Sequence, residues 1–461
     1  INLMKFSLTN KFKERFYDAI KSKDENFIFN SLNEISPADI TILLNEFNSS
    51  DSKYVLDIID SSLSSKIISE LDQDTRISFL KVFSDEEIAK YIEKMDSDDG
   101  ADILSELDIE FRNSVIRCIK DKEKSLNLKD LIRYDDNVAG GLMAKELVRC
   151  NLNWNTIQCI NQIRKQAGEV SKLYSVYVTD DYGELIGKVS LKKIIISKDK
   201  TKINEIYDDY VISVNTSTKA EEVVIIMQKY DLDALPVVNK RGKLVGRITI
   251  DDVVDYITES ADEERQIMSG ISSDVEEDDS IWKLSNARLP WLVIGIFGGF
   301  FGAFFLESFQ NNFIDNYKFF ISLSFFIPLI MATGGNVGIQ SSSLVIQSLS
   351  NPNVFQGSVL TRLFKVSIIA IINGLVLALI VYLGISFLIP DNNKISFIVS
   401  FSLFTVVIIS SLMGTLTPII LDKLGFNPAL ASGPFITTSI DILGLAIYFM
   451  VAIFLNNYWL L

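Results

Sequence analysis

The sequence predicts a multi-domain protein in which a soluble region of helices and α/β units precedes an all-α membrane region. Two observations predict this division. Residues 1–285 hold 38 basic and 54 acidic residues, whereas residues 286–461 hold only six and five. The second region contains five long apolar stretches, each long enough to cross about 30 Å of hydrocarbon as a helix.

The overall composition excludes several classes of protein. The 461 residues carry a formal charge of −15, so phosphate repulsion argues against a nucleic-acid partner. The chain has no histidine and only three cysteines, Cys118, Cys150 and Cys159. A zinc site of the usual kind, a disulfide framework and imidazole-based catalysis are therefore not expected.

Residues 1–132 are predicted to form a cytosolic domain of short, repeated amphipathic helices. Polar caps restart the helices at the runs SPAD (36–39), SDEE (84–87) and SDD (97–99). Each run places a serine before an acidic residue, which is typical of a helix start. Helical stretches of about a dozen residues, each restarted by a polar cap, favour a helical stack.

An internal repeat follows. A strand, a glycine turn and a second strand occur twice, with Gly183 and Gly242 in equivalent positions 59 residues apart. We therefore predict two α/β units, at 133–200 and 201–261. A connecting helix at 262–285 then leads to the membrane region at 286–461.

The predicted spans are 289–309, 319–349, 366–389, 396–421 and 428–455. Charges flanking the spans modestly favour a cytosolic soluble half, by the positive-inside rule. The start of the chain lacks the apolar core of a cleavable signal peptide. We expect a multi-pass protein of the plasma membrane, in contact with lipid, with its N-terminus cytosolic and its C-terminus outside.

Asp441 is the acid that lies deep in a predicted span. A carboxylate there costs about 2.5–3.5 kcal/mol on insertion scales, so it normally faces water, a partner or an ion. Pairing with a polar group on another helix is the alternative. Because no cation lies deep in the other spans, a permeating cation is favoured, and without imidazole or thiolate ligands Mg²⁺ or Ca²⁺ fits best.

Gly334, Gly335 and Asn336 are predicted to interrupt the second span. Asn336 offers a carbonyl oxygen to a pore, while helix packing between small residues is the competing interpretation. One acid per chain is little charge for a bare divalent ion. A hydrated ion held by Asp441 from two chains is the better picture, which predicts a homodimer.

A second acidic group lies near the connecting helix. Asp252, Asp255, Glu259 and Asp262 or Glu263 recur at three- and four-residue spacing, so they share one helical face and repel one another unless a counter-ion binds. Asp98 and Asp102 form a similar pair in the first domain. A solvated acidic face is the simpler interpretation of both groups.

The paired α/β unit resembles a tandem CBS domain, or Bateman module. With the motifs DDNVAGGLM (135–143), TGGNVGIQS (333–341) and NPALASGP (427–434), the chain resembles the MgtE family of magnesium channels over nearly its whole length. The resemblance implies a homodimeric, magnesium-selective channel that closes when cytosolic Mg²⁺ binds between its acidic segments. It assigns this sensor to Asp98, Asp102, Asp231, Asp252, Asp255, Glu259, Glu263 and Glu264.

The resemblance also implies an ATP site. Thr249 and Asp252 form the Thr-x-x-Asp pattern that CBS modules use on a nucleotide ribose, whereas the first copy reads SLKK (190–193) and lacks the acid. Asp252 is claimed by both the sensor and the nucleotide. A Na⁺- or H⁺-coupled divalent-cation carrier is the alternative function. An enzyme is not expected, because no catalytic constellation is present.

Overall fold

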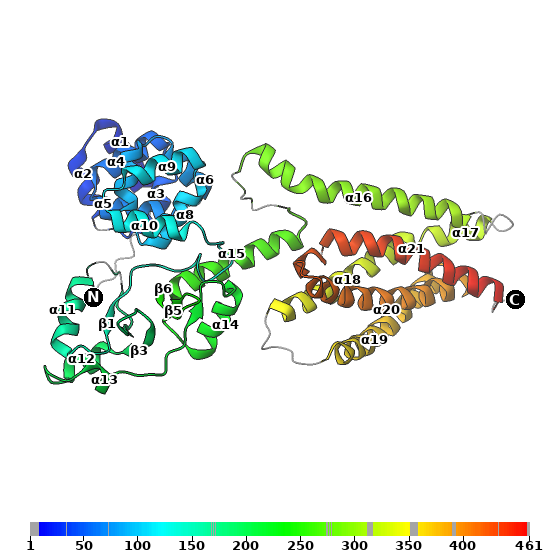
Figure 1. The fold of residues 1–461 in the computed structure, drawn as a ribbon. Coiled ribbons are helices and arrows are strands. Elements are labelled where there is room, and N and C mark those ends of the chain that lie inside the picture. Colours follow the sequence, from blue (N-terminus) through cyan, green and yellow to red (C-terminus); the bar gives the residue numbers. More distant parts are fainter. Residues whose placement is uncertain are drawn as a thin grey trace. The chain divides into compact units, whose positions relative to one another are not determined.

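The computed structural model comprises two compact units, Ile1–Ile257 and Thr258–Leu461. The positions described are 9–33, 35–71, 73–166, 168, 170, 172–272, 275, 277, 279–310, 317–350, 358–389, 393–431 and 433–458. Figure 1 shows the elements of both units. The predicted fold class is confirmed: a helical N region, two small mixed sheets with helices, and five long apolar helices.

The first unit begins with ten short helices. They are α1 (Asn10–Ser22), α2 (Glu25–Leu32), α3 (Pro37–Leu44), α4 (Ser49–Ile58), α5 (Ser61–Ser69), α6 (Gln73–Leu80), α7 (Asp85–Ile92), α8 (Ser97–Glu106), α9 (Ile109–Cys118) and α10 (Lys122–Leu131). Polar caps separate them as predicted, with Ser36 capping α3 and Ser84 forming a capping box at α7. At α8 the prediction was wrong, because Asp96 is the N-cap residue and Ser97 lies inside the helix.

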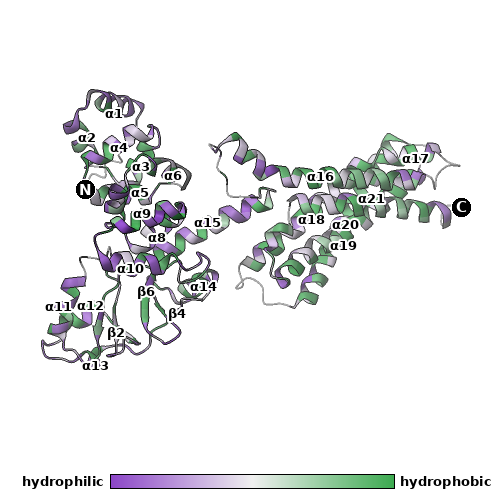
Figure 2. Ribbon diagram, turned by 45° about the horizontal axis from the view of Figure 1, so that its top comes forward, coloured by the Kyte–Doolittle hydropathy of each residue, from purple (hydrophilic) through white to green (hydrophobic). Residues whose placement is uncertain are grey.

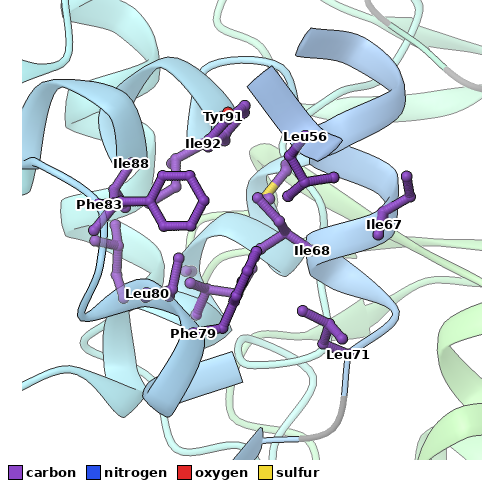
Figure 3. Close-up of a cluster of buried hydrophobic side chains, with 14 of the residues drawn as sticks. Leu56, Ile67, Ile68, Leu71, Phe79, Leu80, Phe83, Ile88, Tyr91 and Ile92 are labelled. Atoms are coloured by element: carbon purple, nitrogen blue, oxygen red, sulfur yellow. The ribbon is translucent and has the colours of Figure 1, made fainter. Parts of the chain in front are cut away.

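Apolar side chains from successive helices form one core. Figure 3 shows part of it, where Leu56, Ile68, Leu80 and Ile92 meet. Phe83 packs edge-on against Tyr91, with ring centroids 5.7 Å apart. Each helix is too short to be stable alone, so burial of these faces holds the domain together.

The repeat appears as two three-stranded sheets of the same topology, β1-β2-β3 and β4-β5-β6, each with one parallel and one antiparallel pair. The elements are β1 (Arg149–Asn151), α11 (Thr156–Gln166), β2 (Val176–Thr179), β3 (Leu185–Val189), α12 (Leu191–Ile196), α13 (Ile203–Ile206), β4 (Val214–Asn215), α14 (Ala220–Tyr230), β5 (Ala234–Val238), β6 (Leu244–Thr249) and α15 (Ile250–Met268). Gly183 and Gly242 turn the two hairpins with φ of 81° and 74°.

The second unit holds the apolar helices, which Figure 2 colours as hydrophobic over most of their length. They are α16 (Ile281–Gln310), α17 (Tyr317–Ser324), α18 (Ile327–Ser350), α19 (Val359–Leu388), α20 (Asn393–Lys423) and α21 (Gly433–Tyr458), with a 3₁₀ turn η2 (Pro428–Ala431) before α21. All but α17 are long and apolar enough to span a membrane.

Three predicted features differ in the structure. The second span is not one helix, because it turns at Phe325 and Phe326 between α17 and α18. The predicted interruption at Gly334 and Gly335 is wrong, since α18 runs through both. The connecting helix is the end of α15, which stops at Met268, and α16 begins at Ile281.

Candidate functional sites

The membrane site is built on α18 and α21, which pack side by side. Gly334 and Gly338 of α18 lie against Ile440 and Ile436 of α21, and a Cβ atom at Gly338 would come within 2.0 Å of the Ile440 side chain. Glycine therefore provides close packing of the two helices. This supports the packing interpretation at Gly334, the first residue of the predicted break.

Asp441 is the ninth residue of α21, about 12 Å along the helix at 1.5 Å per residue. It is half-buried, while Asn336 on α18 is exposed. Thr437, one turn before Asp441, faces Gly335 of α18, next to Asn336. Among the residues that the structure describes, neither the Asp441 carboxylate nor the Asn336 amide forms a hydrogen bond or ion pair. The oxygens of both side chains are therefore available to a cation.

The start of α21 is a junction of several segments of the second unit. Gly433, with φ of 43°, lies so close to α15 that a Cβ atom there would be 2.2 Å from the Met268 carbonyl oxygen. Gly270 lies against Pro434 in the same way. The buried Ser342 hydroxyl of α18 donates to the Ala431 carbonyl just before α21. The end of α15 therefore touches the first turn of the helix that carries Asp441.

Acidic residues from three segments converge in the first unit. Burial raises the pKa of Asp98 well above its usual value, and the nearby Asp252 and Asp99 carboxylates add to the shift. Burial, followed by Asp136 and Asp99, raises the pKa of Asp102 to about 7. The pKa of Asp99 is raised to about 6 by burial and by the Asp96 and Asp252 carboxylates. The side chains of Asp99 and Asp102 are exposed on the protein surface, so their burial is only partial and repulsion from the neighbouring carboxylates is the better-supported cause of the raised pKa values.

Asp99 and Asp136 were missed by the sequence prediction. Asp99 is next to Asp98, which was predicted to belong to the sensor. Asp136 lies in the motif at 135–143 that leads into the repeat. Both residues could therefore have been found from neighbouring sequence features. Within the described part of the chain, no group of three acidic or cysteine side chains is close enough to hold a metal ion directly.

The other predicted sensor residues lie on α14 and α15. Asp231 ends α14 in a left-handed conformation, with φ of 50°. Asp255 is exposed on α15, where burial and Asp251 raise its pKa. Glu259, Glu263 and Glu264 follow on α15, in the part that belongs to the second unit.

A cavity of about 220 Å³ lies between the two α/β units. Its lining includes Tyr177 and Lys188 from the first hairpin and Ala234 and Pro236 from β5. Thr249 is paired with Ala234 across the β5–β6 ladder, so its side chain is on the face that lines the cavity.

The Thr-x-x-Asp pattern follows β6, the strand that pairs with the cavity-lining β5. The Thr249 hydroxyl donates to Asp252 Oδ2 at 2.9 Å, and the Thr249 amide donates to the same oxygen at 2.7 Å. Arg247 is paired with Pro236 in the same ladder and is buried, with its Nε free of hydrogen-bond partners among the described residues. The Arg247 guanidinium donates to the Lys172 carbonyl at 2.9 Å. The cavity lining itself combines tyrosine surface with one cation, Lys188.

Three parts of the chain match protein families. Residues 35–137 match the MgtE intracellular N domain, residues 203–259 the CBS domain, and residues 327–451 the MgtE divalent cation transporter. The magnesium transporter MgtE of Thermus thermophilus is 30% identical over 94% of this chain and 96% of its own. The MgtE of Enterococcus faecalis is 31% identical over 73% of each chain.

Solved structures resemble about half of the chain. The cytosolic domain of the Mg²⁺ channel MgtE in complex with ATP is 29% identical, with a TM-score of 0.50, and the match covers 53% of this chain and 99% of that one. The soluble part of a magnesium transporter, at 23% identity and the same TM-score, covers 54% of this chain and 98% of its own, and shows the fold alone.

Proposed function

The chain belongs to the MgtE family of magnesium transporters, and on that premise we propose that it is a magnesium-selective channel for Mg²⁺ uptake. It is a multi-pass membrane protein with an intracellular N domain, and a transporter rather than an enzyme. The observation that carries the channel proposal is Asp441, a carboxylate in an apolar helix that has no hydrogen-bond or ion-pair partner among the described residues. A coupled carrier would need more titratable groups within the membrane than Asp441. Among the described residues of α16–α21, Asp441 is the acid that lies away from a helix end, and this favours a channel.

The permeation path that we propose lies on the axis of a homodimer. Asp441 from each copy contributes one negative charge, and Asn336 contributes an amide oxygen. Two carboxylates attract a divalent ion without stripping its inner water shell, which Mg²⁺ releases reluctantly. Five membrane helices then place the C-terminus outside the cell, opposite the N domain.

Closure by cytosolic Mg²⁺ is the second part of the proposal. Without Mg²⁺, burial and the Asp252 and Asp99 carboxylates raise the pKa of Asp98, while burial and the Asp136 and Asp99 carboxylates raise that of Asp102, so acids from three segments repel one another. A divalent ion among them removes this repulsion and stabilises the packed arrangement of the N domain on the CBS pair by mass action. Because α15 carries Asp252 at its start and contacts Gly433 at its end, it is the element that transmits this change to α21.

We also propose that ATP binds the cavity between the CBS units. Lys188 in the cavity lining supplies positive charge for phosphates, Tyr177 offers aromatic surface, and Thr249 with Asp252, next to the lining strand β5, suits a ribose. The relative solved with ATP supports this assignment. ATP binding would engage Asp252, so it is coupled to the magnesium cluster.

Single-channel recording of the purified full chain in a planar bilayer tests the channel proposal. Unitary Mg²⁺ currents that need no Na⁺ or H⁺ gradient, and that decline as cytosolic Mg²⁺ rises, are expected. Transport without unitary steps, whose direction follows an imposed Na⁺ or H⁺ gradient, would instead establish the coupled carrier.

A further inference from the structure

A second polar cluster joins the N domain to the CBS pair beside the acidic one, and its charges are balanced. Glu146 Oε2 accepts from the Ser97 hydroxyl at 2.6 Å and from the Ser97 amide at 3.1 Å. Glu146 Oε1 accepts from Lys124 Nζ at 2.7 Å, and Lys124 also donates to the Met95 carbonyl at 2.6 Å. We name Ser97, Lys124 and Glu146 the clamp.

The clamp connects two parts of the first unit. Ser97 and Lys124 belong to α8 and α10 of the N domain. Glu146 follows Ala144, which exchanges two 2.9 Å backbone hydrogen bonds with Arg247 of β6 and so is fixed to the second CBS unit. The Lys145 amide also donates to the Ser97 hydroxyl, at 2.7 Å. These contacts form only when the N domain is packed on the CBS pair.

The clamp is nearly dry. Ser97 is fully buried, and the side chains of Lys124 and Glu146 are 11% and 13% exposed. Burial alone would raise the pKa of Glu146, but the Lys124 ammonium and the Ser97 donors outweigh it and lower the pKa. The adjacent Asp98 is in the opposite situation, since its neighbours are acids. The interface therefore has two parts. The clamp is stable without a metal ion, whereas the acids around Asp98 repel one another without one.

We infer that the clamp sets the Mg²⁺ concentration at which the cytosolic region closes. This inference rests on the proposed function. Contacts that exist only in the packed state favour that state at every Mg²⁺ concentration, so they lower the amount of Mg²⁺ needed to complete closure. Removing one partner of a buried pair leaves the other charge uncompensated, which penalises the packed state strongly.

The test is limited proteolysis of the full chain in detergent across a Mg²⁺ titration. Glu146→Gln keeps the shape and removes the charge, and Lys124→Met removes the cation. Each should raise the Mg²⁺ midpoint of protection by about threefold to tenfold, if two or more bound ions share the loss. The double variant should shift less than the two single shifts combined, because the pair is coupled.

Two further variants make the result decisive. Ser97→Ala removes one donor and no charge, so it should shift the midpoint in the same direction by less. Glu87→Gln breaks the Lys53–Glu87 pair inside the N domain and should leave the midpoint unchanged. Unchanged midpoints in Glu146→Gln, Lys124→Met and Ser97→Ala would overturn the clamp. Absence of Mg²⁺-dependent protection in the parent protein would instead contradict the proposed gating itself.

Discussion

Asp441 is the residue on which permeation depends in the proposed channel. Asp441→Asn preserves the shape of the side chain but removes the charge that attracts the ion. A hydrogen bond to a charged group contributes about 1.5–3 kcal/mol, so Mg²⁺ uptake should fall by about tenfold to hundredfold. Uptake into Mg²⁺-starved cells or liposomes measures this, with gel filtration to show an intact oligomer. Normal uptake by the variant would mean that Asp441 does not bind the permeating ion.

The acids of α8 predict a pH dependence of the metal-free protein. The pKa of Asp102 is raised to about 7 and that of Asp99 to about 6 in the folded chain. A raised carboxyl pKa means that the folded state binds protons more tightly than the unfolded state. The stability that this contributes is present below about pH 4 and is lost as pH rises through the folded pKa values.

Protease protection in EDTA should therefore increase as pH falls from 8 to 6, while the Mg²⁺ concentration needed for closure should rise, because Mg²⁺ must displace protons. Asp102→Asn should flatten the part of the profile near pH 7. A metal-free profile that is flat from pH 6 to 8 in the parent would show that these carboxylates are not strained by their neighbours.

The sequence predicted some of these residues and missed others for a physical reason. Asp98, Asp102 and Asp252 followed from the family resemblance. Asp99 and Asp136 join them because α8, the segment after α10 and α15 pack together, and helical periodicity within one segment cannot show such convergence. Ser97 was taken as a cap, but the same hydroxyl is used by Glu146 some 49 residues later.

Among the elements, the glycines of α18 and α20 determine how closely the membrane helices pack. A Cβ atom at Gly414 would come within 2.3 Å of the Gly338 carbonyl oxygen, a backbone atom that no rotamer change can move. Gly414→Ala should therefore separate α18 from α20, at a cost of about 1–3 kcal/mol, and lower the thermal stability of the detergent-solubilised protein.

Gly335→Ala is the matched control, because its added Cβ meets only the Thr437 methyl group, at 3.7 Å. It should keep the parent stability or exceed it slightly, since alanine favours a helix over glycine. Equal stability of the Gly414 and Gly335 variants would show that close backbone approach does not limit packing here.

Gly335→Leu adds bulk beside Asn336, so loss of flux with an intact fold would place Gly335 at the pore.

Element boundaries were less predictable than element types. Apolar length predicted five spans, yet the second begins after a turn at Phe325 and Phe326 that composition does not reveal. The Tyr448 hydroxyl of α21 donates to the Leu323 carbonyl at the end of α17, at 2.8 Å. A partner 125 residues away thus satisfies a carbonyl at this helix end, which a local pattern could not predict.

For the molecule as a whole, the proposal makes Mg²⁺ both cargo and regulator. The double variant Asp98→Asn with Asp102→Asn removes the repulsion and the ion ligands together. The metal-free packed state should become more favourable, because Asp98 no longer repels Asp252 and Asp102 no longer repels Asp136. Mg²⁺ should then add little further stabilisation.

This gives a signature that misfolding cannot produce. In EDTA the double variant should resist protease better than the parent, and its protection should change less than threefold up to millimolar Mg²⁺. Its conductance at low cytosolic Mg²⁺ should be lower than that of the parent and should no longer decline as Mg²⁺ rises. Asp199→Asn with Asp209→Asn removes two exposed acids from the first unit and should behave as the parent. If the Asp98 and Asp102 variant instead closes at the parent Mg²⁺ concentration, the sensor lies elsewhere, and the acids of α8 form a solvated face.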